Sequence, residues 1–113
     1  MPGVADQRKA VRALLAPLGC PVLFRGEPLP ASGPHAVIDP ISDTDQETWE
    51  SLAPVTFTVL QLSCWAESQG QAIRLDEQAR PLLAAAGWHR QGASRYPHDD
   101  PFHGAQSDYR AVT

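Results

Sequence analysis

Two segments of the chain concentrate side chains that can bind a metal ion or exchange a proton. The first, DPISDTDQETWE, runs for twelve residues from Asp39 to Glu50, with carboxylates at positions one, five, nine and twelve. Carboxylates so placed are typical of a calcium loop. Position three is Ile41, which has no ligating side-chain oxygen, and position six is Thr44, where such a loop needs glycine. The segment therefore favours a solvated acidic loop over a calcium site.

The same segment has a third interpretation, as a loop that contacts another protein. Trp49 is a large apolar side chain, and leaving it in water is costly unless a partner covers it. The candidate contact residues of this acidic loop are Asp43, Asp45, Glu47, Trp49 and Glu50.

The second segment is YPHDDPFH, from Tyr96 to His103. Its histidines and aspartates are metal-ligating residue types, but their spacing matches no zinc motif. The two prolines favour a turn, in which aspartate commonly bonds the backbone. We predict a turn-rich connection that is a second contact region, with the candidates Tyr96, His98, Asp99, Asp100 and His103.

The sequence offers little for catalysis. Ser32 lies in SGP and not in a strand–GxSxG–helix context, while Cys64 lies in a predicted strand with no histidine nearby in sequence. The glycines at 87, 92 and 104 are isolated, so there is no glycine-rich phosphate loop. We therefore expect no enzyme activity, no catalytic residues, no cofactor and no metal site.

Composition limits the remaining classes. The 113 residues predict a single domain, 1–113. The net charge of −4 and the lack of a basic patch argue against sequence-specific DNA binding. No apolar run approaches the ~18 residues that span a bilayer, and the N-terminus has no secretory apolar region. We expect no membrane association and a cytosolic location in the producing cell.

The elements that must position these segments begin with a helix over 4–16, whose apolar residues follow i, i+3, i+4, i+7 spacing. A short edge strand over 20–24, a proline-rich loop over 25–34 and a strand over 35–41 follow.

The longest predicted strand begins at Pro54. Its apolar residues lie at odd positions up to Val59 and at even positions from Leu60, which a strict period of two cannot place on one face. Either a bulge lies near Val59–Leu60, or both faces are covered, one of them by a partner subunit. Under the second alternative, Gln61 and Ser63 are interface candidates.

A second helix, capped by Ser68, has an apolar stripe and ends at Gly87. We predict an ion pair between Asp76 and Arg80 on its surface and a kink or restart at Pro81. Strands over 88–95 and 104–112 complete the chain. This order predicts an α+β fold, a mostly antiparallel sheet of four to five strands with two helices packed on one face.

The segments VLFRG, HAVIDPIS and FTVLQLSCWAES, the helix QAIRLDEQARPLLAAAGW and the closing DYR (108–110) together have a familiar order. This layout resembles the tail-terminator or tail-completion proteins of long-tailed bacteriophages, a family of minor tail proteins, over most of the chain. Pro40 and Pro81 depart from the family pattern.

The resemblance implies a structural virion protein that assembles as a ring, usually a homohexamer. Such a ring lies at the head-proximal end of the tail, ends the growth of the tail tube and joins the tail to the head. Implied partners are the tail tube protein and the head–tail connector or neck proteins, with assembly in the host cytoplasm and DNA passing through the lumen without specific binding. The acidic loop and the second contact region are then candidates for axial or lumen contacts.

Three other classes stay open on the sequence. A neck or head-completion protein of the same junction would share the ring symmetry and the acidic character. A small cytosolic binding module, antitoxin-like or adaptor-like, would be a stable monomer or dimer without a tube partner. A small hydrolase would need a triad or a metal site that the residues do not visibly supply.

Overall fold

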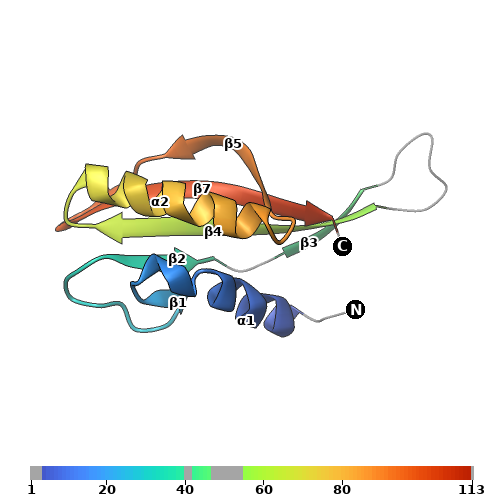
Figure 1. Ribbon diagram of the computed structural model, residues 1–113, viewed down its shortest axis with the longest axis horizontal. Helices are drawn as coiled ribbons and strands as arrows, with labels where there is room; N and C mark the ends of the chain where they lie inside the picture. The colour runs from blue at the N-terminus through green and yellow to red at the C-terminus, as the bar shows by residue number, and fades with distance from the viewer. Residues whose placement is uncertain (1–3, 40–41, 47–54, 113) are drawn as a thin grey trace.

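The computed structural model of the protein describes residues 4–39, 42–46 and 55–112. Within the described residues, ten elements follow one another (Figure 1). They are α1 (Val4–Leu14), the short 3-10 helix η1 (Ala16–Leu18), β1 (Val22–Phe24), β2 (His35–Ile38), β3 (Ser42–Gln46), β4 (Val55–Ala66), α2 (Gln69–Ala84), β5 (His89–Arg95), β6 (His98–Asp99) and β7 (Phe102–Val112).

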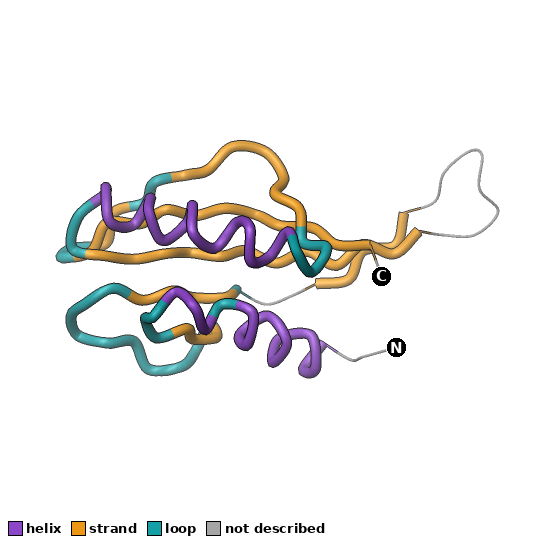
Figure 2. Tube along the Cα trace, in the orientation of Figure 1, coloured by secondary structure: helices purple, strands orange, loops and turns teal. Residues whose placement is uncertain are grey.

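The strands form one sheet, whose central path runs β1-β2-β4-β7-β5 (Figures 1 and 2). All its pairings are antiparallel except that of β1 with β2, which is parallel. The predicted α+β class and mostly antiparallel sheet are therefore confirmed. The four to five expected strands correspond to this path, and two further short strands, β3 and β6, pair with β4 and β7.

The long strand β4 organises the sheet because it pairs with three others. Its pairing with β7 runs without a register shift from Phe57↔Val112 to Ala66↔His103. Of the two alternatives for this strand, a bulge near Val59–Leu60 or coverage of both faces, the bulge is therefore excluded in the pairing with β7. The register shift found in the sheet lies elsewhere, between β5 and β7.

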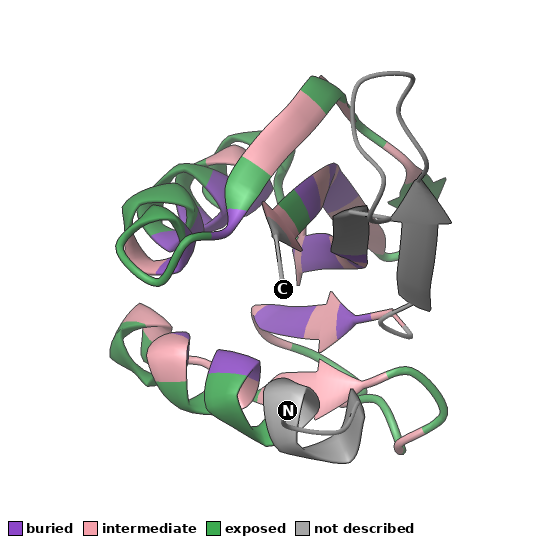
Figure 3. Cartoon of the chain, turned by 90° about the vertical axis from the view of Figure 1, so that its right-hand side faces the viewer, coloured by how far each residue is buried: buried purple, intermediate pink, exposed green. Residues whose placement is uncertain are grey.

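Both helices cover the same face of the sheet (Figure 3). Side chains at even positions of β4, with Leu60 and Leu62 among them, join Val11 and Leu15 of α1 and Leu75 of α2 in one buried cluster. A strand turns successive side chains to opposite faces, so the odd positions, including Gln61 and Ser63, belong to the face without helices. The helices therefore bury the face of the sheet that carries the even-numbered side chains of β4.

Helix α2 matches the predicted signals at both ends. The Ser68 hydroxyl accepts a bond from the Gln71 N–H at 3.2 Å, as an N-cap does. At the other end, Gly87 has φ 90°, and the Trp88 N–H donates to the Leu83 carbonyl at 2.9 Å. This 6→1 bond with a left-handed glycine is typical of a Schellman motif.

Of the kink or restart expected at Pro81, the restart does not occur, since α2 runs unbroken from Gln69 to Ala84. The proline lies on the exposed side, where a carbonyl that loses its helical donor can bond water instead. Among the described residues, no helix is long and apolar enough to cross a membrane.

Candidate functional site

The face of the sheet without helices carries a network of polar side chains from β4, β5 and β7. Arg95 donates two bonds to the Asp108 carboxylate, at 2.9 and 3.2 Å. These bonds lower the pKa of Asp108 and raise that of Arg95. Such bidentate pairs are the strongest geometry for arginine and carboxylate, so they orient both side chains across two neighbouring strands.

The network continues across the sheet to the predicted interface residues. Arg95 Nε donates to Gln106 Oε1 at 3.0 Å, and Gln106 Nε2 donates to the Ser63 hydroxyl at 3.0 Å. Gln61 Nε2 donates to Asp108 at 3.3 Å. The structure therefore brings Gln61 and Ser63 into one hydrogen-bonded surface, in which Ser63 is 4% exposed.

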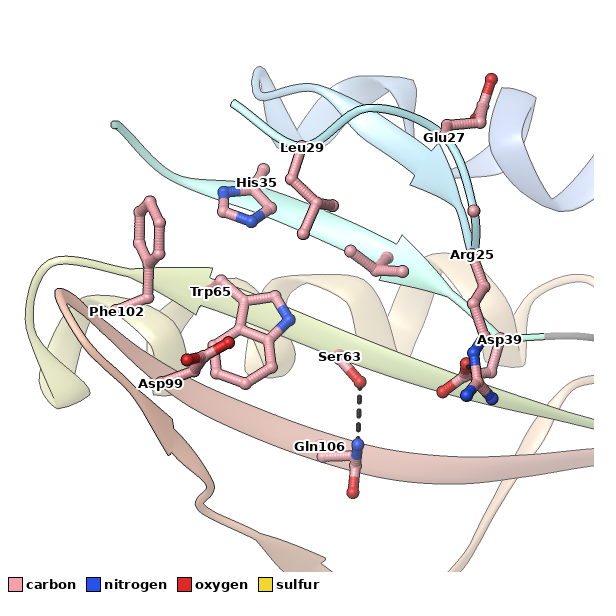
Figure 4. Close-up of a pocket in the computed structure, with 12 residues that line it drawn as sticks. Arg25, Glu27, Leu29, His35, Asp39, Ser63, Trp65, Asp99, Phe102 and Gln106 are labelled. Carbon is pink, nitrogen blue, oxygen red and sulfur yellow. Dashed lines mark hydrogen bonds and ion pairs between the residues drawn. The ribbon is translucent and has the colours of Figure 1, made fainter. Parts of the chain in front are cut away.

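Beside this network lies a groove of about 540 Å³ (Figure 4). It is formed by the loop after β1 together with strands β2, β4, β6 and β7. Its lining residues are Arg25, Gly26, Glu27, Leu29, His35, Val37, Asp39, Ser63, Trp65, Asp99, Phe102 and Gln106.

One end of the groove is aromatic. The buried His35 packs edge-on against Phe102, with ring centroids 4.9 Å apart, and its Nδ1 lies 3.1 Å from the Gly33 carbonyl oxygen. Phe102 is the register partner of Asp99, and Trp65 is the register partner of His35. The first of these pairs places the Phe102 ring beside a carboxylate.

Most charges around the groove are already paired. Arg25 Nη1 lies 3.4 Å from Asp39 Oδ1. Glu27 pairs with Arg12 and also accepts a bond from the Phe24 N–H at 2.6 Å. Asp99 has no hydrogen-bond or ion-pair partner within the described part of the chain, so the groove retains an unpaired carboxylate.

The two predicted contact regions lie at opposite ends of β4. Asp43 and Asp45 belong to strand β3, which pairs with Val55 to Val59, so the expectation of a loop there is wrong. Glu47, Trp49 and Glu50 lie outside the described residues. The second region follows β5 and meets the other end of β4, where His103 pairs with Ala66. At ~3.3 Å per residue, the two ends are roughly 30 Å apart.

The second contact region is more regular than predicted, because β6 pairs with the start of β7 as a short hairpin. The rings of His98 and His103 stack with centroids 4.4 Å apart, and His98 Nε2 lies 3.4 Å from Asp100 Oδ1. Tyr96 is 53% exposed. No group of three metal-ligating side chains occurs among the residues that the structure describes.

Cys64 lies in the core beneath α2, with its side chain on the helix-covered face. Burial raises the pKa of its thiol, and the negative charge of Asp76 raises it further. A thiol kept protonated in this way is a poor nucleophile, and Cys64 packs in the core as a small apolar side chain.

A buried polar cluster lies between α2 and the sheet, and sequence reasoning missed it. Asp76 is 4% exposed and accepts a bond from Ser107 at 3.2 Å, while the Ser107 and Ser94 hydroxyls lie 2.8 Å apart. The predicted surface ion pair of Asp76 with Arg80 is therefore wrong. The available signal was the helical spacing, since Asp76 follows Leu75 and precedes Ala79 within the apolar stripe.

Gly104→Ala should destabilise the protein by about 1–3 kcal/mol, because overpacking a tight site forces its neighbours to move. A Cβ at this position would lie 2.9 Å from Trp65 Cζ3 and 3.0 Å from Pro97 Cγ. Urea denaturation of both forms measures the loss. Gly70→Ala is the matched control, since a Cβ there meets nothing within 4 Å. An equal effect of the two substitutions would show that Gly104 is not a packing site.

The sequence matches no protein-family model and no curated protein. Among solved structures, the fold is similar to that of a chain in the structure titled "Virion of native gene transfer agent (GTA) particle". The TM-score is 0.57, and the match covers 96% of this chain and 90% of that chain. The two sequences are 15% identical, a level at which the likeness concerns the fold. This α+β protein thus shares its fold, over nearly its whole length, with a chain of a gene transfer agent virion.

Proposed function

We propose that the protein is a structural virion subunit of a phage or phage-like particle. In this role it forms a ring, of six copies in the usual arrangement, at the head-proximal end of the tail tube. The ring ends tube growth and joins the tail to the head. The observation that carries the proposal is the shared fold with a chain of a virion particle, which spans 96% of this chain. The subunit acts by assembly and not by catalysis.

The geometry suits a junction subunit, which has to contact partners on two sides. The end of β4 that pairs with β3 and the end that pairs with the start of β7 are far apart on the same strand. One end serves the tail tube protein, and the other serves the head–tail connector or neck proteins. The net charge of −4 keeps DNA from adhering as it passes through the lumen.

The test is electron microscopy of particles assembled in host cytoplasm without this chain. Tubes of uncontrolled length, unattached to heads, are the expected result for a subunit that ends tube growth. Tails of normal length beside separate heads would instead assign the chain to the neck, the alternative role at the same junction. Intact, fully joined particles would leave the small binding module as the better interpretation.

Gln61→Arg should impair ring assembly more than folding. Gln61 is half-buried on the helix-free face, where a neighbouring subunit would meet the sheet, and a longer cation there obstructs close contact. Native mass spectrometry measures the assembly state, and urea denaturation measures the subunit. Ser63 is unsuitable for this purpose because it is buried within the subunit itself.

The matched control is Gln78→Arg, the same change at an exposed position of α2, on the other layer of the molecule. This variant should assemble as the parent does. Full rings formed by Gln61→Arg would show that the helix-free face is not the subunit interface.

A further inference from the structure

We propose that the groove on the helix-free face binds a cationic side chain, arginine or lysine, presented by an extended segment of a basic partner protein. This inference does not depend on ring assembly or on the tail role. It rests on the aromatic lining of the groove, on its unpaired carboxylate and on the charge of the whole chain.

The aromatic lining comes from side chains held in fixed positions. Trp65 packs its six-membered ring against the backbone of Gly104, where even a Cβ would come within 2.9 Å. Phe102 is fixed by its edge-on contact with the buried His35. Leu29 lies at the rim and is 62% exposed. Aromatic faces attract ammonium and guanidinium groups, and the apolar rim suits the methylene stem of such a side chain.

The charges of the groove favour the same ligand. Its lining includes the carboxylates of Glu27, Asp39 and Asp99 and one guanidinium, that of Arg25. Arg25 pairs with Asp39, and Arg12 pairs with Glu27 from outside the groove. The carboxylate of the lining without an ion-pair partner among the described residues is Asp99, which lines the same groove as Trp65 (Figure 4). A cation over the ring would therefore also meet an unpaired negative charge.

The size and the charge of the chain select the kind of occupant. The groove volume of about 540 Å³ lies in the range of ~300–1,000 Å³ that is usual for small-molecule binding sites. A groove of this size is larger than a single ion needs. A second copy of this chain carries the same net charge of −4, so it supplies no excess of cations for this groove. A basic segment of another protein satisfies both conditions.

The probe is the peptide acetyl-Gly-Arg-Gly-amide, compared with the same peptide containing citrulline, which has nearly the shape of arginine without its charge. Titration of the full chain, followed by nitrogen–proton NMR, should shift the Trp65 indole N–H and the Asp99 and Phe102 amides. We expect saturation by about 10 mM peptide, since one cation–π and ion-pair contact gives only weak binding. The citrulline peptide should bind at least about threefold more weakly.

Asp99→Asn should weaken binding of the arginine peptide by about two- to fivefold, the range for one exposed ion pair. The matched control is Asp100→Asn, because Asp100 is the neighbouring carboxylate, does not line the groove and pairs with His98. This control should bind as the parent does. Both positions are exposed, so both variants should fold.

Three results would overturn the proposal. One is equal binding of the arginine and citrulline peptides, and another is an equal effect of the two asparagine variants. The third is self-association of the free chain, in sedimentation velocity, that the peptide reverses, since this would make a second copy the occupant. Each of these results would leave the proposed tail role unaffected, because deletion of the chain tests that role separately.

Discussion

Leu60→Ala should lower the free energy of unfolding by about 2–5 kcal/mol, the usual cost of truncating a fully buried leucine. Leu60 is 0% exposed, pairs in register with Tyr109 of β7 and belongs to the cluster that joins both helices to the sheet. The helix layer cannot close over the lost atoms without moving α1 and α2 together. Because a domain of this size is stable by only about 5–15 kcal/mol, the loss should be visible as a much lower urea midpoint.

Leu29→Ala is the control for this prediction, since Leu29 is 62% exposed. It should change the free energy of unfolding by less than about 0.5 kcal/mol. A loss below about 1 kcal/mol in Leu60→Ala would mean that the helix layer relaxes into the space left behind, and that the two helices are not held against the sheet as tightly as their shared cluster indicates.

Periodicity predicted the helices and long strands well, because their burial follows directly from the spacing of apolar side chains. The even-numbered residues of β4 from Leu60 on and most of the α2 stripe are buried as expected, while Leu82 is half-buried and Ala86, at the helix end, is exposed. The shift of apolar phase before Leu60 left two alternatives, a bulge or coverage of both faces, and the bulge is the one that the structure excludes. Pairing with β7 keeps one register through this region, so the odd apolar residues do not mark a break in the strand.

Strand β3 was missed because its sequence, SDTDQ, has low strand propensity and no apolar alternation. Pairing with β4 provides its backbone partners, and such pairing depends on a distant segment. The groove was missed for a related reason. Its lining comes from five separate parts of the chain, and no local pattern in any of them predicts that Trp65, Phe102 and Asp99 meet.

Tyr109→Phe should remove a loss of stability that the parent protein suffers above pH 10. Burial raises the pKa of the Tyr109 phenol to about 12, the negative charge of Asp76 raises it further, and Arg80 lowers it. The folded state therefore holds the phenol proton more tightly than the unfolded state, whose tyrosine ionises near pH 10. The stabilisation is complete below pH 10 and declines as the pH rises from there through the folded pKa.

The size of this effect follows from the two pKa values. A difference of two pKa units corresponds to at most about 3 kcal/mol, of which about 2 kcal/mol is lost by pH 12, where the folded phenol is half ionised. Urea denaturation gives the difference in free energy of unfolding between the parent and Tyr109→Phe, and the effect is the change in this difference between pH 9 and pH 12.

Tyr96→Phe is the control. It removes the exposed phenol and should still lose stability at alkaline pH as the parent does. If Tyr109→Phe lost as much stability at alkaline pH as the parent, Tyr109 would have to ionise without unfolding the protein. The contact of α2 with β7 near Asp76 would then have to admit water. The loss of stability between pH 9 and pH 12 thus measures how firmly α2 closes over the buried polar cluster. This cluster is the part of the core that holds the helix layer against the sheet.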